Sequence, residues 1–237
     1  MSHAALSDDQ LAYEIAEKAG KLLLEIQRSG LDGKELGKAG DEKANALIIE
    51  LLKLHRPDDA ILSEEEKDNL DRLKAHRVWI VDPLDGTREY GEKRTDWAVH
   101  IALSINKEPT LGAVALPGLG LVLSTGHPPK VPAGNNPPKL LVSRTRPAPD
   151  AVQVAEKLGA ELLPMGSAGA KAMAVVRGEA DIYLHSGGQY EWDNCAPAAV
   201  AKAAGLHVSR ADGSALIYNE ENPYLPDLLI CRPEWAE

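Results

Sequence analysis

The sequence predicts an α/β protein in which helices are layered against β-sheet. Two observations indicate this class: the first 55 residues hold two long amphipathic helical segments, and short apolar runs alternate with helical ones after residue 138. The chain has 237 residues, of which 44% are hydrophobic and 26% charged. That composition is ordinary for a folded protein, and the length is enough to bury a full core.

The N-terminal half begins with a helix. Ser7 and Gln10 form a capping-box pattern, and apolar residues then recur at helical spacing as far as Ile26. A second helix is predicted over 41–54, with Asp41 at or near its N-terminus and Pro57 behind its end. Strands are expected at 60–62 and 77–81, followed by two adjacent antiparallel strands over 97–105 and 111–124.

A proline-rich segment over 126–138 predicts a surface loop or an interdomain linker. We therefore expect an N-terminal α+β part over 1–130 and a C-terminal α/β part over 138–237. The elements predicted in the C-terminal part are strands at 140–143, 161–165, 181–185 and 226–231, and helices at 149–158, 167–177 and 194–204.

Charge and cysteine content exclude several classes of protein. The net charge is −10, which disfavours nucleic acid polymers and anionic membranes as partners. No run of about 18 apolar residues predicts a membrane span, and the start carries no secretory signal pattern. With only two cysteines there is no disulfide framework, so we expect a cytoplasmic protein. A homodimer is a candidate assembly.

The hexapeptide Asp82-Pro83-Leu84-Asp85-Gly86-Thr87 directly follows a buried-looking strand. Pro83 cannot continue a hydrogen-bonded ladder and Gly86 permits an unusual turn. The turn would present two carboxylates, the Leu84 carbonyl and a hydroxyl, which are oxygen ligands for a hard divalent cation. The same residue types also build plain polar turns, and that alternative stays open for the hexapeptide alone.

Three further acidic positions stand at the ends of predicted elements. Glu64 belongs to an acidic run after a strand, while Asp193 and Asp41 are placed to cap helices. Taken singly, each fits a solvated loop or an N-cap. Together they predict a cluster that would repel itself without cations, and two or three Mg²⁺ ions would relieve that repulsion and activate water for phosphoryl chemistry.

In this order, Asp41, Glu64-Glu65, the hexapeptide and Trp192-Asp193 resemble the lithium-sensitive, Mg²⁺-dependent phosphatase superfamily of inositol monophosphatase. The resemblance implies a layered αβαβα sandwich. It also implies metal ligation by Glu64, Asp82, the Leu84 carbonyl, Asp85 and Asp193. We expect Glu64 and Thr87 to hold and deprotonate a metal-bound water, and the candidates for the carboxylate partner that Thr87 needs are Asp41 and Glu64.

Within that superfamily, Arg88-Glu89-Tyr90 is similar to the branch that acts on 3′(2′),5′-bisphosphate nucleotides, whose actinobacterial members are implied to serve sulfate assimilation. The implied substrate is adenosine 3′,5′-bisphosphate or its sulfated relative. The residues implied to contact it are Glu64, Leu84, Asp85, Gly86, Thr87, Ser143, Arg144, Arg146, Ser167, Lys171 and Asp193.

Two alternatives stay open at this point. One is a phosphatase acting on inositol 1-phosphate or fructose 1,6-bisphosphate, and the other is a non-catalytic sensor of nucleotide or metal. His100, on an apolar strand, is expected to be a structural core histidine. Cys195 is expected to pack as a small hydrophobic side chain.

Overall fold

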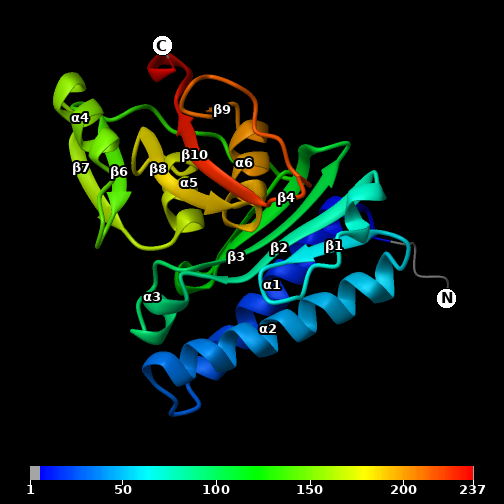
Figure 1. The fold of residues 1–237 in the computed structure, drawn as a ribbon. Helices are drawn as coiled ribbons and strands as arrows, with labels where there is room; N and C mark the ends of the chain where they lie inside the picture. The colour runs from blue at the N-terminus through cyan, green and yellow to red at the C-terminus, as the bar shows by residue number, and fades with distance from the viewer. Residues whose placement is uncertain (1–5, 237) are drawn as a thin grey trace.

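The computed structural model describes residues 6–236 and contains two five-stranded sheets (Figure 1). The first sheet has the order β1-β2-β3-β4-β5, with β1 parallel to β2 and antiparallel pairs thereafter. The second has the order β7-β6-β8-β10-β9. The strands are β1 (Ala60–Ser63), β2 (Arg77–Asp85), β3 (Ala98–Ile105), β4 (Glu108–Leu116), β5 (Leu121–Ser124), β6 (Lys139–Ser143), β7 (Glu161–Met165), β8 (Ile182–Tyr190), β9 (His207–Ser209) and β10 (Tyr224–Cys231).

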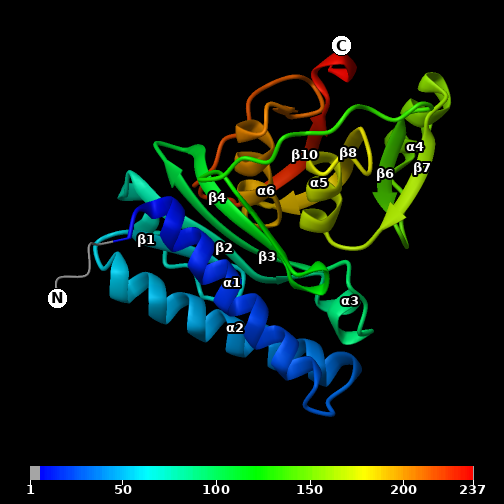
Figure 2. The ribbon, with the colours of Figure 1, turned by 180° about the vertical axis from the view of Figure 1, so that it is seen from behind.

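Helices cover and separate the two sheets, as the front and back views show (Figures 1 and 2). Helices α1 and α2 pack on one face of the first sheet, α5 and α6 lie between the sheets, and α4 covers the second sheet. This is the αβαβα layering that the resemblance implied, so the prediction of the fold class is confirmed. The helices are α1 (Asp8–Gln27), α2 (Gly33–His55), α3 (Thr87–Gly91), α4 (Pro149–Leu158), α5 (Ala168–Val176) and α6 (Glu191–Ala203).

Three apolar clusters fill the spaces between these layers. One joins α1 and α2 to the first sheet, a second surrounds α5 and α6, and a third lies under α4. The chain has no phenylalanine, and the middle cluster is rich in alanine. Small side chains let α6 approach the sheet closely: a Cβ atom added at Gly112 of β4 would lie 3.0 Å from the Cα of Ala196.

Helix α2 begins at Gly33, so the predicted start near Asp41 is wrong and Asp41 lies in the middle of the helix. The first two turns escaped prediction because close packing requires glycine there. An added Cβ at Gly37 would lie 2.8 Å from Thr87, and one at Gly40 would lie 2.8 Å from the Tyr90 ring. Glycine carries no hydrophobic side chain, so the periodic pattern is interrupted although this face is buried.

Other boundaries also differ from prediction. The run predicted as one strand over 111–124 is divided into β4 and β5 by a short 3₁₀ turn at Pro117–Leu119. Helix α6 begins at Glu191, so Asp193 lies within its first turn instead of preceding it. The capping box of Ser7 and Gln10, helix α4 and strand β7 are confirmed as predicted. The division into parts 1–130 and 138–237 stays a prediction.

Candidate active site

The predicted hexapeptide lies at the end of β2, in the first sheet. Pairing of β2 with β3 breaks between Asp82 and Asp85, where Pro83 interrupts the ladder. Within this irregular stretch the Leu84 amide donates to Asp82 Oδ1 at 3.0 Å. Asp82 and Asp85 are both buried, with exposed fractions of 1% and 7%. The irregularity therefore holds two carboxylates inside the protein, facing the helices of the next layer.

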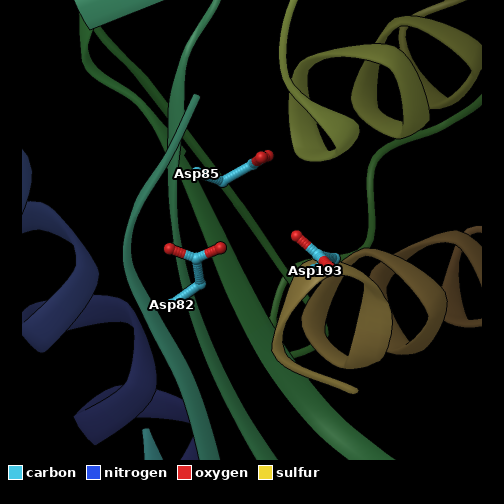
Figure 3. Close-up of side chains that lie close together, drawn as sticks. All are labelled: Asp82, Asp85 and Asp193. Atoms are coloured by element: carbon cyan, nitrogen blue, oxygen red, sulfur yellow. The ribbon is translucent and has the colours of Figure 1, made fainter. Parts of the chain in front are cut away.

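Asp193 completes a group of three carboxylates. It projects from the first turn of α6 toward Asp82 and Asp85 (Figure 3). Each of the three offers an oxygen that lies within 4.8 Å of those of the other two. The Tyr190 amide donates to Asp193 Oδ2 at 2.6 Å, which fixes the carboxylate at the helix start. Burial and the nearby Asp85 raise the pKa of Asp193 to about 6.

Asp85 differs from its neighbours because donors surround it. The amides of Ala168 and Gly169, at the start of α5, donate to it at 3.2 and 2.5 Å. His100 Nε2 lies 3.2 Å from Asp85 Oδ2. Burial opposes ionisation of Asp85, but the attraction of His100 and the helix amides prevail, and its pKa lies below the ordinary value.

His100 also contacts helix α6, which carries Asp193. It is fully buried, and its Nδ1 donates to the Trp192 carbonyl at 2.9 Å. Sequence reasoning took His100 for a structural core residue and missed its contact with the carboxylate cluster. The available signal was a lone polar residue on an apolar strand, which pairs across the sheet with Asp82.

Glu64 and Asp41 extend the acidic group on the other side of Asp82. Burial and the charge of Asp193 raise the pKa of Glu64 to about 7. Burial, together with Glu65 and Glu64, raises the pKa of Asp41 to about 8. Burial and the charges of Glu64, Asp85 and Asp193 raise the pKa of Asp82 well above its ordinary value.

Thr87 links Asp41 to the hexapeptide. Its hydroxyl lies 3.5 Å from Asp41 Oδ1 and 3.2 Å from the Leu84 carbonyl oxygen, so it can donate to either. Gly86, with φ of 88°, turns the chain between β2 and α3, a conformation that glycine adopts readily. A cleft of about 670 Å³ opens beside Asp41 and Thr87 and is also lined by Gly33, Lys34, Gly37, Lys38, Glu42, Glu65, Arg88, Gly91 and Glu92.

The donor set fits a hard divalent cation. Carboxylate oxygens are its preferred ligands, and those of Asp82, Asp85 and Asp193 converge on one space. The raised pKa values of Asp82, Glu64 and Asp193 are what uncompensated negative charge in a buried site produces. A bound cation would reverse that effect, so the chemistry of the cluster is that of a metal site.

Two of the three cations predicted to hold substrate, Arg144 and Lys171, are engaged with protein groups. The Arg144 guanidinium donates to Glu89 at 2.9 Å and to Glu92 at 2.8 Å, and Arg146 is exposed with its amide donating to Ser143 Oγ. Lys171 is 5% exposed, and its ammonium donates to the carbonyls of Ser167 and Gly166.

Ser167 serves as the N-cap of α5, where its hydroxyl accepts from the Ala170 amide at 3.0 Å. It is buried with an exposed fraction of 6%. The roles of Ser143, Arg144, Arg146, Ser167 and Lys171 toward a substrate stay predictions.

Comparison with known proteins decides the family. The sequence profile of the inositol monophosphatase family matches residues 7–236. The chain belongs to the inositol monophosphatase family. Within this family it is 49% identical to the 3′-phosphoadenosine 5′-phosphate phosphatase of Mycobacterium leprae, over 98% of this chain and 92% of that protein. It is 31% identical to the 3′(2′),5′-bisphosphate nucleotidase CysQ of Escherichia coli K12, over 79% of this chain and 81% of that protein.

Solved structures of inositol monophosphatase family proteins share the fold. The crystal structure of CysQ from Bacteroides thetaiotaomicron superposes with a TM-score of 0.82 at 26% identity, covering 95% of this chain and 97% of that one. Inositol monophosphatase II of Staphylococcus aureus gives a TM-score of 0.80 at 17% identity, covering 95% and 91%. Among residues 6–236, no helix is both long enough and apolar enough to cross a membrane.

Proposed function

We propose that this protein is a Mg²⁺-dependent phosphatase that removes the 3′-phosphate of adenosine 3′,5′-bisphosphate, and of its sulfated relative, with release of inorganic phosphate. One observation carries the proposal: a buried cluster of Asp82, Asp85 and Asp193 stands in a chain about half identical, over nearly its whole length, to proteins named as phosphatases of this nucleotide.

The proposed ligand set for Mg²⁺ is Glu64, Asp82, the Leu84 carbonyl, Asp85 and Asp193, with two or three ions per site. When bound, Mg²⁺ would lower the pKa of coordinated water and offset the charge of the phosphoryl group. The protein's own contribution is orientation. The ladder break fixes Asp82, and His100 and the α5 amides fix Asp85.

Asp41, Glu64 and Thr87 are proposed to position the attacking water and accept its proton. A hydroxyl is a poor base by itself, so Thr87 requires a carboxylate partner, and Asp41 lies 3.5 Å from its Oγ1. Without a bound cation, the pKa values of Glu64 and Asp41 are raised to about 7 and 8. The amides of Gly86 and Thr87 would donate to phosphate oxygens.

The spectator 5′-phosphate is proposed to contact the basic group of Lys171, Arg144 and Arg146, with Ser143 and Ser167 as hydroxyl donors. At present one guanidinium nitrogen of Arg144, Nη2, donates to both Glu89 and Glu92. Binding the phosphate requires exchange of these partners, and a phosphate can then accept from the guanidinium bidentately. We further propose that the protein works in a reducing cytoplasm, which its two buried free cysteines support.

The test compares phosphate release from adenosine 3′,5′-bisphosphate, inositol 1-phosphate and fructose 1,6-bisphosphate at about 1 mM Mg²⁺, within the usual range of substrate constants. We expect the largest kcat/KM for the nucleotide and its loss in Asp82→Asn. A preference for either of the other substrates would refute the assigned substrate while leaving the metal site intact. Mg²⁺ binding without turnover of any of the three substrates would favour the alternative of a non-catalytic sensor of nucleotide or metal.

A further inference from the structure

Three aromatic side chains form an exposed platform at the start of α6, next to the carboxylate cluster. Tyr190 and Trp192 are stacked, with ring centroids 4.8 Å apart and planes at 10°. Tyr224 meets Tyr190 edge-on, with centroids 6.0 Å apart and planes at 79°. We call these three residues the aromatic platform. Nothing in the chemistry proposed for phosphate hydrolysis uses it.

The platform is exposed where an aromatic cluster would normally be covered. Tyr190 and Tyr224 have exposed fractions of 46% and 45%, while Trp192 is partly buried and packs against the middle apolar cluster. Trp192 covers one face of the Tyr190 ring, and the exposure of Tyr190 leaves area for a further ring. Contiguous exposed aromatic surface of this kind is typical of sites that bind a ligand or a partner.

The backbone that carries the platform is joined directly to the metal site. The Tyr190 amide donates to Asp193, and the Trp192 carbonyl accepts from His100, which in turn contacts Asp85. Tyr224 is the register partner of Tyr190 across β10 and β8. The rings therefore stand at a fixed position relative to Asp193, to which Trp192 is adjacent along the chain.

A glycine pair makes room for the third ring. Gly187 and Gly188 have φ angles of 117° and 93°, and a Cβ atom at Gly188 would collide with the ring of Tyr224. This irregular stretch of β8, where the register with β10 shifts, thus requires glycine both for its conformation and for the Tyr224 ring. His185 Nε2 donates to the Gly188 carbonyl at 3.0 Å within the same stretch.

We propose that the aromatic platform stacks the base of the nucleotide substrate, an inference that rests on the proposed function. Stacking suits a protein of net charge −10 because it needs no cation, and every base has a ring face that an aromatic side chain can cover. Two cations that could otherwise hold a nucleotide, Lys171 and Arg144, already donate hydrogen bonds to protein groups. The platform would distinguish nucleotides from inositol and sugar phosphates, which have no aromatic ring.

The test measures binding of AMP and of ribose 5-phosphate, which lacks the base, by calorimetry in the presence of Mg²⁺. For Tyr190→Ala we expect the affinity for AMP to fall about tenfold and the advantage of AMP over ribose 5-phosphate to shrink accordingly. With adenosine 3′,5′-bisphosphate as substrate, KM should rise about as much while kcat changes less than twofold. Tyr190→Phe keeps the ring and should restore both the affinity for AMP and the KM. Tyr224→Ala should also lower the affinity for AMP.

Tyr13→Ala is the matched control, since Tyr13 is a partly exposed tyrosine on α1, across the first sheet from α6. Thermal melting of each variant checks folding. If Tyr190→Ala loses affinity for AMP and for ribose 5-phosphate equally, or for neither, the platform is not a base site, even if the nucleotide is hydrolysed. If the wild type does not hydrolyse the nucleotide, the proposed function fails; a Tyr190-dependent preference for AMP would still support the platform, and its absence would overturn it.

Discussion

Replacing Asp82 by Asn should abolish phosphatase activity and yet stabilise the metal-free protein. Asp82, Asp85 and Asp193 present carboxylate oxygens within 4.8 Å of one another, in a buried site. Asparagine has nearly the same shape, and its carbonyl oxygen can still accept from the Leu84 amide as Asp82 does. The substitution therefore removes negative charge while it leaves the local geometry in place.

The expected gain follows from the repulsion that disappears. At an effective dielectric constant of about 20, two unit charges 4.8 Å apart repel by about 3.5 kcal/mol. Protonation of one partner already relieves part of this repulsion, as the raised pKa of Asp82 indicates. We therefore expect the free energy of unfolding of Asp82→Asn to exceed that of the wild type by about 2 kcal/mol in EDTA at pH 8.

The stability of the metal-free protein should fall as the pH rises. The folded-state pKa values of Glu64 and Asp193, about 7 and 6, lie above their ordinary values, so protonation favours the folded state. Their contribution to stability is complete below about pH 4 and is lost as the pH rises through about 6 and 7. The metal-free wild type should lose stability over this window, and Asp82→Asn should lose less. Urea unfolding in EDTA, repeated with Mg²⁺, measures both effects.

Asp181→Asn provides a matched control of opposite sign. Asp181 is also fully buried, but it accepts from Arg232 Nε at 2.8 Å and from the Lys139 amide at 2.8 Å. Neutralising it leaves the buried guanidinium of Arg232 without an opposite charge and should cost about 3 kcal/mol with or without Mg²⁺. If Asp82→Asn is as stable as the wild type in EDTA, or less stable, the carboxylates do not repel one another as argued and the reasoning from burial and charge is refuted.

Three further variants test other parts of the fold. His100→Leu should weaken Mg²⁺ binding 10- to 100-fold by releasing Asp85, as measured by calorimetry; unchanged affinity would show that the α5 amides suffice. Arg72→Met should lower the free energy of unfolding by about 3 kcal/mol in urea, because the buried guanidinium donates to Asn219 Oδ1 at 2.8 Å; a smaller loss would mean that this contact is replaceable. Ser7→Ala should cost about 1 kcal/mol by removing the cap of α1, and an unchanged urea midpoint would contradict that role.

Turn residues in the sequence predicted the elements whose two ends they mark. Helix α4 and strand β7 have the predicted boundaries, since their apolar patterns are bounded by clear turn residues. Periodicity failed where backbones approach closely. The start of α2 uses Gly37 and Gly40 against Thr87 and Tyr90, contacts that only the tertiary structure reveals. Hydrophobic periodicity is read from side chains, so it cannot identify a helix face that packs through glycine.

The acidic cluster was predictable because its members stand at the ends of elements, where a chain can turn inward. Asp82, Asp85 and Asp193 do converge. The partners that fix them were not predictable: His100 looks like an ordinary core position, and the α5 amides that hold Asp85 belong to a helix more than 80 residues away along the chain. Local sequence shows which residues can bind a cation, whereas the sequence-distant contacts decide how they are held.

The close approach of α6 to the first sheet has a consequence for how this protein can be altered. Gly112 lies on β4, and its missing side chain is what allows Ala196 to sit against the strand. Ala196 is three residues after Asp193 on the same helix. A methyl group added at Gly112 would push the helix outward and carry Asp193 away from Asp82 and Asp85. A substitution at this apolar interface can therefore weaken the carboxylate cluster although it contacts neither the substrate nor a metal ligand.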